Sequence, residues 1–188
     1  MESSTKNRLT SKQIQALSQQ AFGTDVKEYA ENCIGEFNTI YIIKLADREV
    51  VLKIAPKDDT GVLRYEKNAM QTEVDALRLI KAKTDIPVPE VLFYSKQICD
   101  FDYFFAEKLQ GENFYKVSPE LSAEQNSKIL FRIGQYNRQI NEIRNKKFGS
   151  LTNLNKQTNR QLENCFFRYN VRHTKRRQGC RYSAARVV

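Results

Sequence analysis

Residues 35–53, GEFNTIYIIKLADREVVLK, predict two β-strands joined by a tight turn at Asp47 and Arg48. β-Branched and aromatic residues dominate both halves of this stretch, and these residue types are enriched in strands. We expect the first strand to divide its side chains between two faces, with Ile40, Ile42 and Leu45 on one and Tyr41 and Ile43 on the other. The stretch therefore predicts a hairpin within a larger sheet.

Lys53 interrupts the second apolar strand, VVLKIA. Burying a lysine is costly unless its charge meets a partner. One interpretation is therefore a buried lysine that is paired with an acidic side chain, and the alternative is a position on the strand that faces solvent. Residues 65–83 predict a helix, because their apolar residues recur at the spacing of one buried stripe. The stripe comprises Ala69, Met70, Val74, Leu77 and Ile80. Glu73 lies at its edge and can reach a lysine on a neighbouring strand, with Glu66 as a rival partner.

Five segments follow one another in an order that is typical of one enzyme family. They are GEFNTIYII, VVLKIA, TEVDALRLI, IPVPEVLFYS and YFFAEKLQGENF. Over about residues 14–149 the chain resembles the N-terminal lobe of the aminoglycoside phosphotransferase and choline kinase-like family. The resemblance implies a two-lobed, protein-kinase-like fold. It also implies ATP-dependent transfer of phosphate, with magnesium, to a hydroxyl group of a small molecule.

The resemblance implies roles for four residues near the phosphates of the nucleotide. Lys53 would contact the α- and β-phosphates, and Glu73 would hold Lys53 in place. Gly35 and Asn38 would mark the loop in which the phosphates lie, since glycine lets free backbone N–H groups approach an anion. The alternative for Gly35 is a plain turn at the entry to a strand.

The resemblance also implies a hinge between the two lobes at Ala106 to Leu109. Backbone groups near Glu107 and Leu109 would then form hydrogen bonds with the adenine. The alternative is an edge strand that ends at the turn of Gln110 and Gly111.

The chain as a whole predicts an α+β fold, with a five-stranded antiparallel sheet and one main helix against it. The remaining strands are expected at residues 26–34, 91–95 and 103–109. Capping boxes at Thr10 and Gln13, and at Ser122 and Gln125, predict two further helices, of which the second carries a stripe that we expect to be buried. We predict a nucleotide-binding lobe at residues 1–109, the start of a C-terminal lobe at 110–150 and a basic tail at 151–188.

The catalytic half of the family pattern is missing from the sequence. The family has a loop of the form HGDxxxxN, with a catalytic aspartate, and a further aspartate that binds magnesium. The only histidine is His173, which we interpret as a tail residue, and no aspartate follows Asp102. We therefore expect a truncated chain that is inactive alone. The alternative is a non-catalytic remnant that still binds ATP.

The tail holds nine basic residues against the single acidic Glu163, and thus all but one unit of the chain's net charge of +9. A back-translation of residues 161–188 can be read one nucleotide later as an acidic and apolar peptide that resembles the family. We therefore predict that the tail is out of frame. The rival function is binding of nucleic acid or another polyanion, through basic residues interleaved with aromatic ones. The nearly neutral body and the lack of a nucleic-acid-binding motif argue against it.

The remaining sequence features favour a cytoplasmic protein that does not cross a membrane. The start is polar and lacks the apolar core of a signal peptide, and no apolar run is long enough to span a bilayer. The four cysteines form no CxxC pair, which argues against a zinc site or a disulfide framework. In the family the N-terminal lobe packs on a C-terminal lobe of several helices, of which this sequence predicts only the first. The surface left uncovered would be apolar, and we therefore expect self-association.

Overall fold

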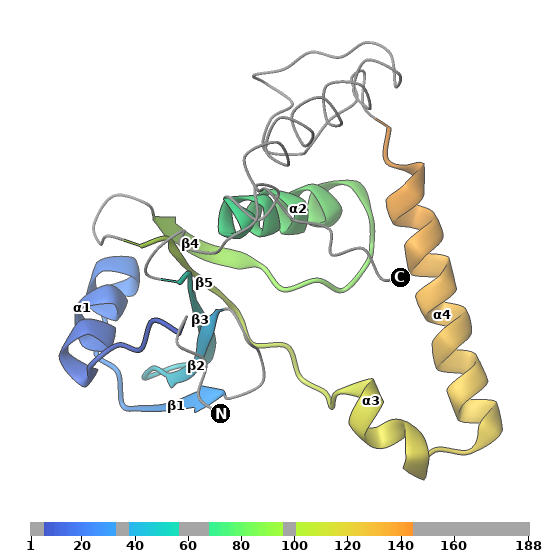
Figure 1. Cartoon of the computed structure of the whole chain (residues 1–188), viewed down its shortest axis with the longest axis horizontal. Coiled ribbons are helices and arrows are strands. Elements are labelled where there is room, and N and C mark those ends of the chain that lie inside the picture. The colour runs from blue at the N-terminus through green and yellow to red at the C-terminus, as the bar shows by residue number, and fades with distance from the viewer. Residues whose placement is uncertain (1–5, 33–37, 57–67, 96–100, 145–188) are drawn as a thin grey trace, which may run out of the picture. The chain divides into compact units, whose positions relative to one another are not determined.

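The computed structural model describes residues 6–32, 38–56, 68–95 and 101–144 (Figure 1). The chain divides into two units, residues 1–143 and 144–188, and the described residues belong to the first except for Arg144. The predictions for Gly35, Glu66, His173 and the basic tail lie outside the described residues.

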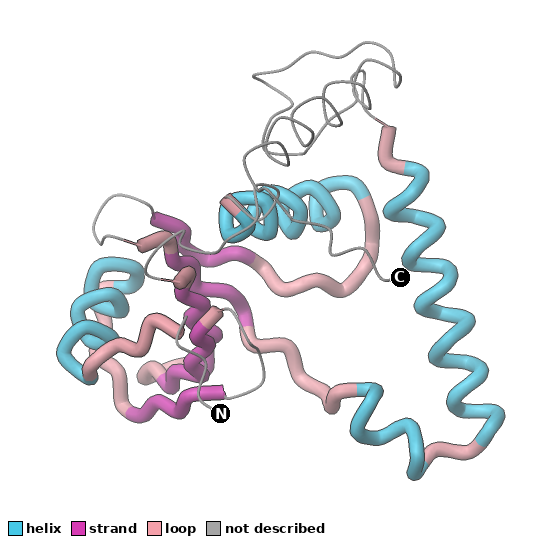
Figure 2. Tube along the Cα trace, in the orientation of Figure 1, coloured by secondary structure: helices cyan, strands magenta, loops and turns pink. Residues whose placement is uncertain are grey.

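Five antiparallel strands, coloured magenta in Figure 2, form a single sheet. Their order in the sheet is β1-β2-β3-β5-β4. The strands are β1 Glu28–Asn32, β2 Thr39–Lys44, β3 Glu49–Ile54, β4 Val91–Ser95 and β5 Tyr103–Glu107. The turn between β2 and β3 is closed by a hydrogen bond from the Leu45 N–H to the Arg48 carbonyl, at 2.8 Å. The predicted α+β class with a five-stranded antiparallel sheet is confirmed.

One face of the sheet packs against helix α1, Ser11–Phe22. Ile14 and Leu17 of the helix are buried in a core with strand residues such as Ile43 and Phe105. Leu45 is buried in the same core, so its predicted placement with Ile40 and Ile42 is wrong. The reason is that side chains alternate along a strand, and position 45 shares its parity with 43 rather than with 42.

The other face packs against helix α2, Ala69–Lys83. Met70 and Val74 of α2 are buried with Phe104 and Ala106 of β5, as the predicted apolar stripe requires. Basic residues occupy the last turn of α2, where they complement the negative end of the helix dipole. The sheet therefore has a separate small core on each face.

Beyond β5 the chain forms the short helix α3, Phe114–Val117, a 3₁₀ turn at Ser118–Glu120 and the long helix α4, Ala123–Glu142. The predicted capping box of Ser122 and Gln125 is present. The prediction that α4 has a buried stripe is wrong for the described part of the chain, because none of its residues is buried. An amphipathic pattern shows which face of a helix can be buried, but burial needs an element that covers it.

Candidate functional site

Lys53 and Glu73 form the closest charge pair between the sheet and helix α2. The Nζ of Lys53 on β3 donates to both carboxylate oxygens of Glu73 on α2, at 2.7 and 2.6 Å. The side chain of Lys53 is 20% exposed and that of Glu73 is 37% exposed. The pair is therefore reachable from solvent, and the ammonium group keeps a fixed position from which it can attract an anion.

Lys53 lies within a regular row of paired residues on the α2 face of the sheet. The register places it opposite Ile40 of β2 and Phe104 of β5. The next row on this face contains Ile42, Val51 and Ala106, which are paired across β2, β3 and β5. Ile42 and Val51 are only half-buried, so this row offers an apolar surface beside the charged pair.

The sequence does not by itself predict that these three apolar residues form one surface: Ile42 is expected on a strand face and Ala106 at the hinge, without a link between them. The signal that could have found them is the alternation of the strand, because Val51 lies two positions before Lys53 and therefore shares its face. The partners across the sheet depend on register, and this cannot be read from one strand alone.

Asn38 and Gly35 are the two residues predicted to mark the loop near the phosphates. Asn38 is a half-buried residue in the bend that directly precedes β2. Because Thr39, which follows it, pairs with Ile54, Asn38 lies at the same end of the sheet as Lys53. Gly35 lies outside the described residues.

The two predicted hinge residues lie at the end of β5. Glu107 is the last residue of the strand, and its N–H donates to the Glu90 carbonyl at 2.9 Å. Only the carbonyl of Glu107 could therefore serve a ligand through its backbone. Leu109 is 46% exposed. Since Glu107 pairs with Val50, the hinge lies three residues along β3 from Lys53, or roughly 10 Å at the usual rise of a strand.

Charged side chains surround this end of β5. The Nζ of Lys108 lies 2.5 Å from a carboxylate oxygen of Glu49, and this hydrogen bond lowers the pKa of Glu49. The hydrogen bond from Lys81 likewise lowers the pKa of Glu90. An open cavity of about 480 Å³ lies between these groups. Its lining comprises Arg48, Glu49, Val50, Glu90, Leu92, Glu107, Lys108 and Gln110.

Neither Lys53 nor Glu73 lines this cavity. Val50 and Leu92 pack in the core on the α1 face, whereas Lys53 and Val51 belong to the α2 face. The cavity is therefore distinct from the surface that carries the charge pair.

The donor set on the α2 face fits a nucleotide better than it fits magnesium. An ammonium group beside an apolar row matches a phosphate joined to a flat ring system. Magnesium needs several oxygen ligands, and the described residues contain no group of three or more His, Cys, Asp or Glu side chains that could hold a metal. The described residues therefore do not fit a magnesium ion. None of the described helices has the length and apolar character needed to cross a membrane.

Comparison with solved structures gives partial likenesses. A ternary complex of a thermostable mutant of the aminoglycoside phosphotransferase APH(4)-Ia with AMP-PNP and hygromycin B matches 52% of this chain and 29% of its own, with 18% identity and a TM-score of 0.37. The GDP and kanamycin complex of APH(2″)-IIIa matches 53% and 31%, with 15% identity and a TM-score of 0.41.

Among curated proteins, two strains of Aspergillus fumigatus have a subtelomeric hrmA-associated cluster protein that is 28% identical to this chain over 137 residues. The match covers 71% of this chain and 26% of each relative, so the chain spans about a quarter of the length of these proteins. The family model of the phosphotransferase enzyme family matches residues 34–184, which is well over half of the chain and includes Lys53, Glu73 and much of the tail. The chain therefore belongs to the phosphotransferase enzyme family.

Proposed function

We propose that this chain binds ATP on the α2 face of its sheet. The observation that carries the proposal is the bidentate contact of Lys53 with Glu73, at 2.6 and 2.7 Å, in a member of a phosphotransferase family. A lysine held in this way presents a fixed positive charge, which is the chemistry that nucleotide phosphates require.

The other site residues divide between the phosphates and the base. Gly35 and Asn38 would contribute to the phosphate end. The row of Ile42, Val51 and Ala106 would form an apolar surface for the adenine ring.

The hinge residues would supply backbone hydrogen bonds to the edge of the adenine. We assign this role to the carbonyl of Glu107, because its N–H is already bonded to Glu90, and to a backbone group of Leu109. The separation of roughly 10 Å between Glu107 and Lys53 along β3 leaves room for a base at one end and phosphates at the other.

The reaction of the family is the transfer of a phosphoryl group to the hydroxyl group of a small molecule. This chain lacks the HGDxxxxN loop and has no aspartate after Asp102, so we propose that it binds ATP in the cytoplasm but does not catalyse transfer by itself. We also propose that its tail is out of frame. The sequence of the gene tests the last point, because codons incompatible with the shifted peptide would contradict it.

The function is tested by isothermal calorimetry with ATP and Mg²⁺. We expect the parent chain to bind and Lys53→Ala to lose most of this binding. Lys81→Ala is the matched control, because Lys81 is also a lysine paired with a glutamate, at 2.8 Å from Glu90, but lies on the exposed side of α2. A folded parent chain that does not bind ATP, or a Lys53→Ala variant that binds as well as the parent, would refute the proposal.

A salt titration separates this function from binding of polyanions by the tail. The affinity of a basic tail for nucleic acid falls steeply as salt rises. Binding releases counterions from the nucleic acid, and this release becomes less favourable when the salt concentration is high. ATP binding that depends on Lys53 should change much less between low and high salt.

A further inference from the structure

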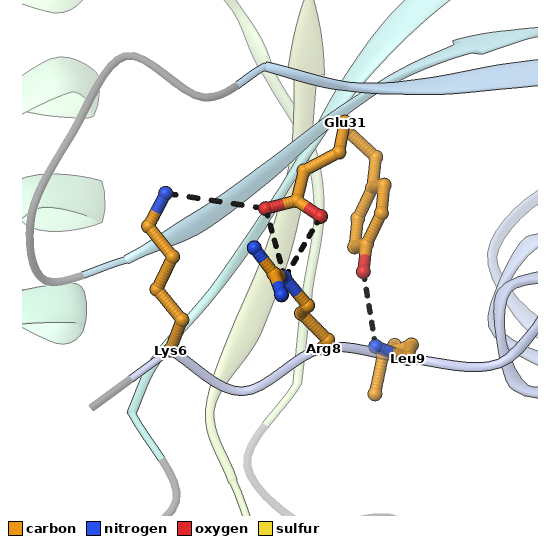
Figure 3. Close-up of polar contacts among 5 residues, drawn as sticks. Lys6, Arg8, Leu9 and Glu31 are labelled. Atoms are coloured by element: carbon orange, nitrogen blue, oxygen red, sulfur yellow. Dashed lines mark hydrogen bonds and ion pairs between the residues drawn. The ribbon is translucent and has the colours of Figure 1, made fainter. Parts of the chain in front are cut away.

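Residues 6–9 precede helix α1 and lie on the α1 face of the sheet, where Leu9 is buried in the core. We call them the N-terminal segment. Figure 3 shows two of its side chains converging on Glu31 of β1. The Nζ of Lys6 lies 3.9 Å from one carboxylate oxygen of Glu31, and the Nε of Arg8 lies 3.1 Å from the other. These contacts fix the segment to the β1 edge of the sheet.

Asn7 connects the N-terminal segment to the end of strand β3. Its side chain is buried, and its amide nitrogen donates to the carbonyl of Ala55 at 3.4 Å. Because Pro56 follows and has no N–H, this carbonyl is the only group of its peptide bond that can form a hydrogen bond. The segment is also held to β2, since the N–H of Leu9 donates to the hydroxyl of Tyr41 at 3.0 Å. Asn7 therefore reaches Ala55 from a segment that is itself anchored.

Ala55 is held from a second direction by strand β5. Its N–H donates to the carbonyl of Asp102 at 2.9 Å. This bond lies one position beyond the last pair of the β3–β5 ladder, Ile54 with Tyr103. Both backbone groups of Ala55 are thus hydrogen-bonded, and loss of the Asn7 amide would release the carbonyl while leaving the bond to β5 in place.

Ala55 also packs beneath helix α2. It contacts the small core of the α2 face, which includes Met70 and Val74. It lies two positions after Lys53, so the two side chains share a face of the strand. Glu73 adjoins Val74 in the sequence. Ala55 therefore supports the part of α2 from which Glu73 reaches Lys53.

We propose that Asn7 is a positioning residue for the ion pair of Lys53 and Glu73. By holding Ala55, it fixes the surface on which α2 rests, and with it the place of Glu73 beside Lys53. Asn7 itself belongs to a segment on the α1 face, so it would not touch a nucleotide bound on the α2 face. The inference rests on the proposed function for its effect on ATP, and goes beyond it by giving a role to a residue outside the site.

The second polar atom of Asn7 allows a positioning role to be separated from a purely structural one. Its Oδ1 is buried and has no hydrogen-bond partner among the described residues. A buried acceptor without a partner lowers stability. Asn7→Leu removes the donor to Ala55 but also removes this unpaired acceptor. We therefore expect the urea midpoint of Asn7→Leu to stay close to that of the parent chain, whereas the contact between Lys53 and Glu73 should loosen.

The first experiment needs no ligand. The NMR signal of the Lys53 ammonium group, assigned by its absence from Lys53→Ala, reports the contact with Glu73. We expect Asn7→Leu to shift this signal part of the way towards its position in Glu73→Gln. Asn7→Ala cannot donate to Ala55 either, so it should shift the signal in the same direction, and it provides the test if the leucine variant does not fold.

Ser18→Ala is the matched control for both experiments. Ser18 is also a buried polar residue on the α1 face, and its Oγ likewise has no hydrogen-bond partner in the part of the chain that the structure describes. It lies within α1 and not in the segment that reaches Ala55. Its substitution should leave both the Lys53 signal and the affinity for ATP unchanged.

The second experiment measures ATP affinity by calorimetry in a double-mutant cycle. We expect Asn7→Leu to weaken ATP binding roughly fivefold, the equivalent of about 1 kcal/mol for one lost hydrogen bond. In the Glu73→Gln background the same change should have little further effect, because the contact through which Asn7 acts is already weakened. Effects of the two substitutions that simply multiply would show that Asn7 does not act through the pair.

The outcomes separate this inference from the proposed function. A Lys53 signal that stays unchanged in the Asn7 variants, or independent effects in the cycle, would overturn the positioning role of Asn7. A parent chain that binds no ATP, or whose binding ignores Lys53, would contradict the proposed function instead. The shift of the Lys53 signal would then still test the position of the ion pair, since it is measured without a nucleotide.

Discussion

Glu73 fixes the position of the Lys53 ammonium group through two hydrogen bonds from one donor atom. Glu73→Gln keeps the shape of the side chain but removes its charge, so the lysine is held less firmly. Since a hydrogen bond with a charged group contributes about 1.5–3 kcal/mol at most, we expect ATP to bind roughly tenfold more weakly while the fold is retained. Calorimetry on Glu73→Gln, with the circular dichroism of both proteins compared, checks this; equal affinities would contradict a holding role for Glu73.

Tyr94 and Asp102 make stability sensitive to alkaline pH. The hydroxyl of Tyr94 donates to the carboxylate of Asp102 at 3.3 Å, and burial, followed by the charge of Asp102, raises the pKa of Tyr94 above its ordinary value of 10.0. The folded protein therefore holds this proton after the unfolded chain has lost it. The stability that the proton contributes is complete below about pH 10 and declines as the pH rises further.

We therefore expect the free energy of unfolding to fall more steeply above about pH 10 in the parent chain than in Tyr94→Phe. Urea unfolding at a series of pH values measures the difference. A residual decline should persist in the variant, because burial also raises the pKa of Tyr41. Parallel curves for the two proteins would show that Tyr94 ionises equally in both states.

Some contacts between single residues could be predicted from the sequence, and others could not. The contact between Lys53 and Glu73 could be predicted, because an isolated charge in an apolar strand needs a partner and Glu73 lies at the edge of a helical stripe. The row of Ile42, Val51 and Ala106 could not, since its members are ordinary strand residues that come together only through the register of three strands. The contact between Arg8 and Glu31 was missed for a similar reason: the two residues lie far apart in the sequence, and neither has a local pattern.

At the level of helices and strands, the two capping boxes are a matched pair. Thr10 caps α1, whose residues Ile14 and Leu17 are buried, whereas Ser122 caps α4, which has no buried residue. Loss of a cap costs about 0.5–2 kcal/mol, but only a helix that is packed in the core transmits this cost to global unfolding. We expect Thr10→Ala to lower the urea midpoint and Ser122→Ala to leave it nearly unchanged; equal shifts would mean that α4 unfolds together with the sheet.

The boundaries of the elements followed the sequence closely where a local signal was present. Thr10 with Gln13, and Gly23 in the left-handed region at φ 66°, mark both ends of α1 as their residue types predict. The errors concern Leu45 and the burial of α4. The placement of Leu45 was wrong because it did not follow the alternation of side chains along the strand, which the local pattern does contain. The burial of α4 depends on which element covers the helix, and a local pattern does not contain this information.

For the molecule as a whole, the exposed apolar residues of α4 predict self-association. Phe131 and Leu130 are 69% and 57% exposed, and neighbouring exposed apolar side chains favour contact with another molecule. We expect the purified chain to sediment as a dimer or larger species, and Phe131→Lys to shift it towards the monomer. Tyr115→Lys is the control, because Tyr115 is also exposed but lies on the short helix α3. A parent chain that is monomeric at high concentration would contradict this expectation.

The strand order places β5 between β3 and β4, and this has a consequence for folding. Phe104 reaches its position beside Lys53 only after the chain has closed a loop of roughly fifty residues, which costs conformational entropy before any contact compensates for it. The hairpin of β2 and β3 can form early, whereas the central pairing of β3 with β5 must form late. During synthesis the surface around Lys53 therefore stays incomplete until β5 has left the ribosome, and a nascent chain that ends before residue 103 has Lys53 but no sheet neighbour on one of its sides.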